Sequence, residues 1–299
     1  MSDNTSSALR RLTDAARQTH PEAPEDAAQM LCEGLALLPG EPGDLESFVG
    51  AAQHVMLGHL DDAAALREAL DRVQPFAEGR AGVATAVARG RLAIALRDNA
   101  HCASSLPAPE HIRALYDAAL ACSRRGEWPA VRERLAAATG FTQEGDPATQ
   151  RGYASMANNI ADDIRFYFKP EQRREAGRVD AMLDAARRAR EAWAKAGGWM
   201  ETERADYQLA MCHAVAGQGR EALSHAQACL AVCEANAADA YERFFAFEAL
   251  AHAHAAGDQP RAAKQARDRM AECLRQVDDA ESRAYAEPCL AKVDEMLAQ

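Results

Sequence analysis

Residues 203–236 read ERADYQLAMCHAVAGQGREALSHAQACLAVCEAN, and they contain two apolar stripes with helical spacing. The first stripe ends just before Gly217, and the second starts soon after Gly219. The stripes consist of Ala205, Leu209, Cys212 and Ala216, and then of Leu223, Ala226, Leu230 and Cys233. Each helix is apolar on one side only, and a short turn separates the two helices. Their apolar sides must therefore face each other. This stretch therefore predicts an antiparallel helical hairpin.

The same plan recurs in residues 241–274, YERFFAFEALAHAHAAGDQPRAAKQARDRMAECL. Its turn glycine is Gly257, which lies 40 residues after Gly217 (257 − 217 = 40). Self-similarity at such a period is typical of a solenoid, in which each hairpin buries its apolar face against the next.

A spacing motif accompanies the turns: a glycine that ends a helix precedes, by five residues, a small residue where two helices cross. The motif occurs at Gly217/Ala222, Gly257/Ala262 and Gly58/Ala63, and in a weaker form at Gly126/Val131. Gly58 and Gly126 are 68 residues apart (126 − 58 = 68), twice the ~34-residue period of tetratricopeptide (TPR) repeats. The chain thus resembles TPR proteins over 199–277 and, less closely, over 44–139. The consensus aromatic residues are mostly absent.

The resemblance implies an all-α fold, a right-handed superhelical array of antiparallel helix hairpins with about 14 helices. We expect N-terminal hairpins in 1–140 and TPR-like repeats with a capping helix in 141–299, together forming one continuous array. Helical periodicity predicts helices near 6–19, 24–37, 44–58, 61–73, 79–98, 109–125, 128–139, 148–168, 171–196, 199–216, 219–236, 239–256, 260–276 and 279–298.

Individual residues predict how several of these helices begin and end. Prolines suit first turns, acidic side chains cap helix starts, and glycines accept the left-handed conformation that ends a helix. The residues concerned are Pro24, Pro109 and Pro260, Asp44 and Asp239, and Gly126, Gly217 and Gly257.

Composition narrows the class of protein. Hydrophobic residues make up 48% of the chain and aromatic residues only 6%, which favours small-residue helix packing over β-sheet. A net charge of −11 argues against nucleic acid and anionic membrane as partners. The chain shows neither a secretory signal nor a membrane span, so we expect a cytoplasmic protein, and its excess of arginine over lysine suggests a bacterial source. The eight cysteines are interpreted as small buried hydrophobic residues.

Few groups of residues are candidates for a metal site or a catalytic site. His225, Cys229 and Cys233 share one side of a helix and are possible metal ligands. Because they are spread over two helical turns, they cannot by themselves all bind one ion. His252 and His254 diverge on a helix, as do the neighbours Asp162 and Asp163. Phosphate-binding and hydrolase motifs are absent from the sequence. We therefore expect no cofactor, no metal and no enzymatic activity.

A binding surface is the stronger hypothesis, because the first helix of each hairpin lines the concave face of such an array. The TPR resemblance places there Asn158, Asn159, Asp162, Arg165, Arg204, Tyr207, Gln208, Met211, Glu248 and His254, together with Phe244 and Phe247. Adjacent asparagines disfavour a helix interior, so Asn158 and Asn159 either hold a peptide backbone or tie down a neighbouring loop. The phenylalanines near 244–247 are interpreted as core residues.

The sequence therefore predicts a non-enzymatic scaffold or adaptor that binds a protein or peptide on its concave face. One alternative is a peptide-sensing regulatory module of a bacterial signalling system, and another is an enzyme with a pocket near Asn158 and Asp162. The apolar stripe of 279–298 (Leu290, Val293 and Leu297) would either cap the array or pair two copies as a homodimer.

Overall fold

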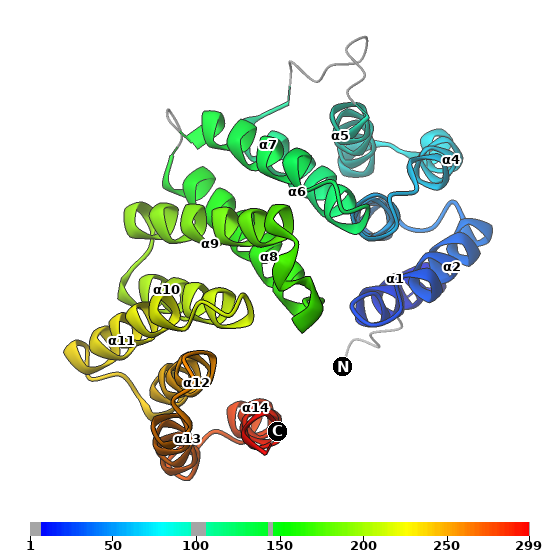
Figure 1. Cartoon of the computed structure of the whole chain (residues 1–299). Coiled ribbons are helices and arrows are strands. Elements are labelled where there is room, and N and C mark those ends of the chain that lie inside the picture. Colours follow the sequence, from blue (N-terminus) through cyan, green and yellow to red (C-terminus); the bar gives the residue numbers. More distant parts are fainter. Residues whose placement is uncertain (1–6, 97–105, 143–145, 299) are drawn as a thin grey trace. The chain divides into compact units, whose positions relative to one another are not determined.

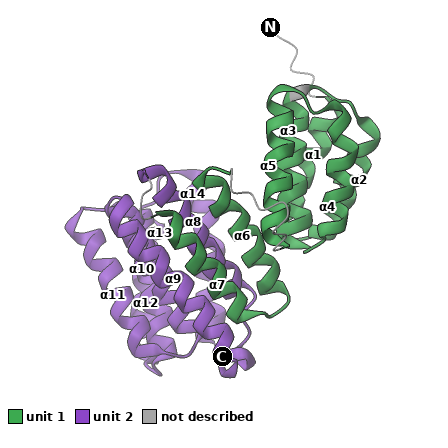
Figure 2. Cartoon of the chain, turned by 90° about the horizontal axis from the view of Figure 1, so that it is seen from above, with its two compact units in different colours: residues 1–145 green, residues 146–299 purple. Residues whose placement is uncertain are grey.

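A computed structural model describes residues 7–96, 106–142 and 146–298, and within these ranges all regular structure is helical. It divides the chain into two compact units, residues 1–145 (unit 1) and residues 146–299 (unit 2) (Figure 2). The predicted all-α fold is confirmed. The predicted boundary at residue 140 and the continuity of the hairpins across it stay predictions.

The helices of each unit follow one another along the chain (Figure 1). Unit 1 contains α1 (Ala8–Thr19), α2 (Pro24–Gly34), α3 (Pro42–Ala52), α4 (Ala63–Val73), α5 (Gly79–Ala95), α6 (Ala108–Arg124) and α7 (Trp128–Thr139), with a π-helical segment, η2 (Gln53–His59), between α3 and α4. Unit 2 contains α8 (Pro147–Phe166), a 3-10 turn η6 (Pro170–Arg174), α9 (Ala176–Ala196), α10 (Trp199–Val215), α11 (Gly219–Ala235), α12 (Ala240–Ala256), α13 (Pro260–Leu274) and α14 (Ala280–Leu297). The predicted end of the fifth helix at 98, and Cys102, lie outside the described residues. None of the described helices has the length and apolarity that a membrane crossing requires.

Unit 2 is built in two layers. The first helices of successive hairpins, α8, α10, α12 and α14, contact one another in that order, and α9, α11 and α13 pack behind them (Figure 1). Alanines fill much of the core, which lets helix axes approach closely, and Phe244 is its largest fully buried side chain. The stripe of α14 packs here as well: Val293 is fully buried, and Leu290 and Leu297 lie partly buried against the same core. The stripe thus packs on the core of unit 2, and whether α14 also pairs two copies stays a prediction.

Four of the described turns share one backbone register. At each of the four, a residue with positive φ follows the first helical segment, and a fully buried residue lies five positions later in the second helix. The pairs are Asp61/Leu66, Gly126/Val131, Gly217/Ala222 and Asp258/Ala263. Each buried residue sits in the first turn of its helix, where the two helices of the hairpin cross.

This register corrects the sequence prediction at two of the four turns. Gly257 has φ −94 and the left-handed residue is Asp258, so the repeat from Gly217 is 41 residues long (258 − 217 = 41), not 40. Gly58 lies inside η2 and does not end a helix; Asp61 takes the left-handed conformation there. Aspartate tolerates that conformation better than most residues, so a search for glycine misplaces both turns.

Helix starts follow the predicted capping chemistry with one exception. The Asp239 carboxylate caps α12 by accepting a hydrogen bond from the Glu242 amide at 3.0 Å. Asp44 was predicted to cap the third helix, but that helix starts two residues earlier at Pro42 and Asp44 lies in its first turn. There its carboxylate accepts a hydrogen bond from the Ser7 hydroxyl at 2.5 Å.

The described cysteines are mostly buried, as predicted. Cys122, Cys212, Cys229, Cys233 and Cys273 are buried, whereas Cys289 is partly exposed and Cys32 is exposed, contrary to the prediction.

Candidate functional site

The predicted residues of α8 lie along one side of that helix, because positions 158, 162 and 165 are spaced by four and three. Asn158 is half-buried and Asn159 is exposed. Among the described residues, no hydrogen bond engages either side-chain amide. Neither asparagine therefore ties down a loop of the described chain, which was the structural alternative.

Asp162 joins α8 to α10. Arg165 forms an ion pair with Asp162, and the Gln208 amide donates to the Asp162 Oδ1 at 3.5 Å. The Asp162 side chain is 49% exposed, whereas Gln208 is buried. Within the described chain, the buried Nε of Arg165 has no hydrogen-bond partner. The site thus contains a guanidinium whose donors are not all used.

Tyr207 joins α10 to α12. Its hydroxyl donates to Glu248 Oε2 at 2.8 Å. Burial raises the pKa of Glu248, an effect that the Tyr207 hydrogen bond and the nearby Arg165 oppose. Burial and the Glu248 carboxylate raise the pKa of the Tyr207 phenol, which therefore keeps its proton and acts as a donor.

His252 lies within range of the Arg165 charge, and the sequence analysis did not place it there. It lies one turn after Glu248 on α12, and burial followed by the charge of Arg165 lowers its pKa to about 4, so the ring is neutral at pH 7. The predicted residue His254 occupies the turn instead, where its Nδ1 lies 2.8 Å from Gln259 Oε1. His213 and Gln218 form the equivalent contact at 2.7 Å in the preceding turn. The i, i+4 spacing from Glu248 was the signal that pointed to His252.

Two other predicted residues lie outside the network. Arg204 is bound by Glu242, with Nε 3.2 Å from Oε2. Met211 is buried within unit 2. The structure therefore joins Asp162 to Arg165 and Gln208, and Tyr207 to Glu248, and the charge of Arg165 also acts on the second pair.

An aromatic group adjoins the network at Tyr207. Phe245 packs against Tyr207 and Tyr241 with ring centroids 5.9 and 5.0 Å apart, and against Tyr285 of α14 at 6.2 Å. Tyr285 is 65% exposed, whereas Phe244 is fully buried, as predicted. Phe247 is half-buried beneath the Arg269 guanidinium, 5.3 Å from its ring centroid.

Two of the three residues first considered as metal ligands, His225 and Cys229, contact carboxylates on α10. His225 Nδ1 lies 3.0 Å from Asp206 Oδ1, and the buried Cys229 thiol donates to Glu203 Oε1 at 2.8 Å. The hydrogen bond with Cys233, together with burial and the charge of Glu203, raises the pKa of Cys229, so it remains a thiol.

Unit 1 contains a second cluster that the sequence analysis did not identify, formed by His20, His54 and His59. Burial lowers the pKa of His59 to about 3, with further contributions from the other two histidines and from Arg124 and Arg113. The one sequence signal was a pair of histidines five residues apart, a spacing that an ordinary α-helix does not bring together.

Comparisons with known proteins leave the family open. No protein-family model matches the chain, and no curated protein matches it. Among solved structures, the chain matches the crystal structure of the P58(IPK) TPR domain with 11% identity and a TM-score of 0.28. The match covers 98% of this chain and 99% of that chain. At this TM-score the match adds nothing to the fold seen directly in the helices.

Proposed function

We propose that unit 2 is a helical-repeat scaffold that binds an extended protein segment, without chemistry of its own, on the face of α8, α10, α12 and α14. The observation that carries the proposal is the position of Tyr207. Its hydroxyl belongs to the polar network and its ring to the aromatic group. One continuous row of helices thus presents charged, amide and aromatic groups together.

This mixture suits recognition of a peptide. Tyrosine and arginine are enriched at the centres of protein interfaces, and amides such as Asn158 and Asn159 pair with a peptide backbone. Asp162 is half-exposed and the chain carries a net charge of −11, so a segment of basic or mixed charge is favoured over an acidic one.

The test is selection of peptides from a displayed library on the full chain, followed by fluorescence-polarisation titration of a selected peptide. We expect an Asn158→Ala/Asn159→Ala/Tyr285→Ala variant to bind at least about tenfold more weakly, equivalent to ~1.4 kcal/mol. These side chains are half-buried or exposed, so the fold should tolerate their loss, which circular dichroism checks.

A matched control removes two amides and an aromatic ring elsewhere: Phe76→Ala/Gln227→Ala/Gln265→Ala, all exposed and outside the proposed face. Its affinity should stay within about twofold of the wild type. Equal losses in both variants, or a library from which no peptide is enriched, would contradict the proposal.

A further inference from the structure

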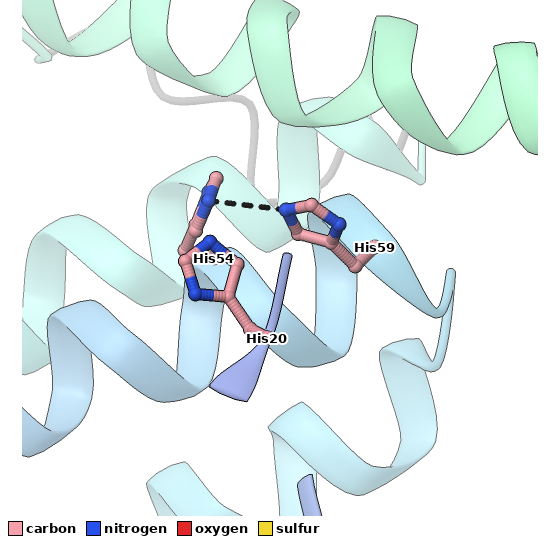
Figure 3. A group of neighbouring side chains, drawn as sticks. All are labelled: His20, His54 and His59. Atoms are coloured by element: carbon pink, nitrogen blue, oxygen red, sulfur yellow. Dashed lines mark hydrogen bonds between the residues drawn. The ribbon is translucent and has the colours of Figure 1, made fainter. Parts of the chain in front are cut away.

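Three imidazole rings from two elements of unit 1 converge on one point (Figure 3). His20 follows α1 directly, and His54 and His59 belong to η2. Their ring centroids are 4.7 to 5.0 Å apart, and one nitrogen of each lies within 4.8 Å of the others. His54 Nε2 and His59 Nε2 are 3.2 Å apart. Two nitrogens of a tetrahedral zinc site are separated by roughly 3.3 Å, given Zn–N bonds of ~2.0–2.1 Å.

The π-helical backbone is what places His54 and His59 together. In an α-helix, residues five apart point about 140° away from each other, because each residue turns by about 100°. In a π-helix the backbone hydrogen bonds join residues five apart, which brings His54 and His59 towards the same side of η2. Such π-helical insertions are rare and are frequently found at functional sites.

A neighbouring carbonyl orients His20 in the manner of a metal ligand, and a carboxylate lies close to His54. His20 Nδ1 lies 2.7 Å from the carbonyl oxygen of Arg17, so Nδ1 carries the proton and Nε2 has a free lone pair. His54 Nδ1 lies 3.8 Å from Oδ1 of Asp117, a fully buried carboxylate on α6. That oxygen has no hydrogen-bond partner among the described residues. A small rotation of His54 would complete a carboxylate–histidine pair.

We propose that His20, His54 and His59 bind one divalent transition-metal ion of the zinc type through their Nε2 atoms, with Asp117 as the group that orients His54. Three neutral imidazoles are a donor set that suits zinc, cobalt, nickel and copper, and not the oxygen-seeking magnesium or calcium. The negative charge of Asp117 partly offsets the charge of the bound dication.

The fourth coordination position is directed to solvent or a small anion. His20 and His54 border a groove of about 560 Å³ whose lining includes Arg17, Arg91 and Arg113. Arg113 Nη2 lies 3.2 Å from His54 Nδ1, and metal binding at Nε2 requires this guanidinium to shift towards Asp117, whose Oδ1 is 3.7 Å from its Nε. Arginines beside an open metal position favour an anionic fourth ligand.

The test titrates the chelator-treated full chain with Co²⁺ and Zn²⁺, using the visible absorption of Co²⁺ and isothermal titration calorimetry. We expect one ion per chain, a four- or five-coordinate Co²⁺ spectrum, and displacement of Co²⁺ by Zn²⁺. His54→Ala should weaken binding by more than about 100-fold, and Asp117→Asn by about 10- to 100-fold. His111→Gln alters a histidine of the same unit that contacts Leu106 and Phe141, and it should bind as the wild type does.

His20→Ala is a second ligand variant, used if circular dichroism shows that His54→Ala does not fold. The proposal is overturned if the wild-type chain gives only the weak spectrum of six-coordinate Co²⁺. It is also overturned if a folded ligand variant binds both ions as tightly as His111→Gln does. The site lies in unit 1, so the result is independent of peptide binding by unit 2.

Discussion

Replacing Glu203 by glutamine is expected to stabilise the protein by up to about 3 kcal/mol at pH 8.5 and by far less at pH 5. Glu203 is 1% exposed, and its Oε2 has no hydrogen-bond partner among the described residues. Burial, reinforced by the adjacent Glu242 and opposed by the Cys229 hydrogen bond, raises the pKa of Glu203 to about 7. At alkaline pH the fold must therefore hold a poorly compensated buried charge.

The direction of the effect follows from proton linkage. The folded protein binds the Glu203 proton more tightly than the unfolded chain, whose glutamate pKa is about 4.3. The contribution of this proton to stability is complete below that pKa and is lost as pH rises through about 7. Glutamine is neutral throughout and keeps an acceptor for Cys229, so the variant should not lose stability over this window.

Urea unfolding followed by circular dichroism between pH 5 and pH 8.5 measures this difference. Amide hydrogen exchange should locate the protection gained at alkaline pH on α10, α11 and α12, which contribute Glu203, Cys229 and Glu242. Glu234→Gln on the exposed surface of α11 is the control and should retain the wild-type pH dependence. An unchanged pH dependence in Glu203→Gln would show that Glu203 is not the titrating group.

Replacing Gly219 by alanine is expected to destabilise unit 2 by about 3 kcal/mol. A Cβ at this position would lie 2.5 Å from both the Cα and the N of Gly257, and 2.7 Å from the carbonyl carbon of Ala256. All of these are backbone atoms, so no side-chain rotation relieves the overlap. The α10–α11 and α12–α13 turns would have to separate.

Thermal unfolding measures the cost, for which we expect a midpoint lowered by roughly 6–12 °C. Gly152→Ala is the matched control, because Gly152 lies within α8 and an added Cβ there meets nothing within 4 Å. That change should stabilise the helix by about 0.5–1 kcal/mol. A Gly219→Ala protein that melts at or above the wild-type temperature would refute the close approach of the two turns.

Gly257 misled the sequence prediction. A glycine after a helix commonly indicates a left-handed residue, but Gly257 has φ −94 and leaves the left-handed position to Asp258, while its backbone lies against Gly219. The sequence separation of these two glycines is almost one repeat. Only the packing of adjacent hairpins reveals that they touch.

The sequence predicted only part of the candidate binding face. Helical spacing and the TPR resemblance placed Asp162, Arg165, Tyr207, Gln208 and Glu248 on successive first helices. In the structure an ion pair and a hydrogen bond join Asp162 to Arg165 and Gln208, and another hydrogen bond joins Tyr207 to Glu248. The register failed at the end of α12, where His254 contacts Gln259, and it is His252 on which the charge of Arg165 acts.

The sequence by itself determined the helices, most of their starts and the hairpin order, because apolar periodicity, proline, aspartate caps and glycine turns act over a few neighbouring residues. The tertiary structure alone decided three features: the raised pKa of Glu203, the contact of Gly219 with Gly257, and the convergence of His20 with His54 and His59. Each feature depends on groups that are far apart in the chain, and the histidine cluster depends also on the π-helical geometry of η2. Local sequence patterns do not predict such features, because burial and distances are set only when the helices pack.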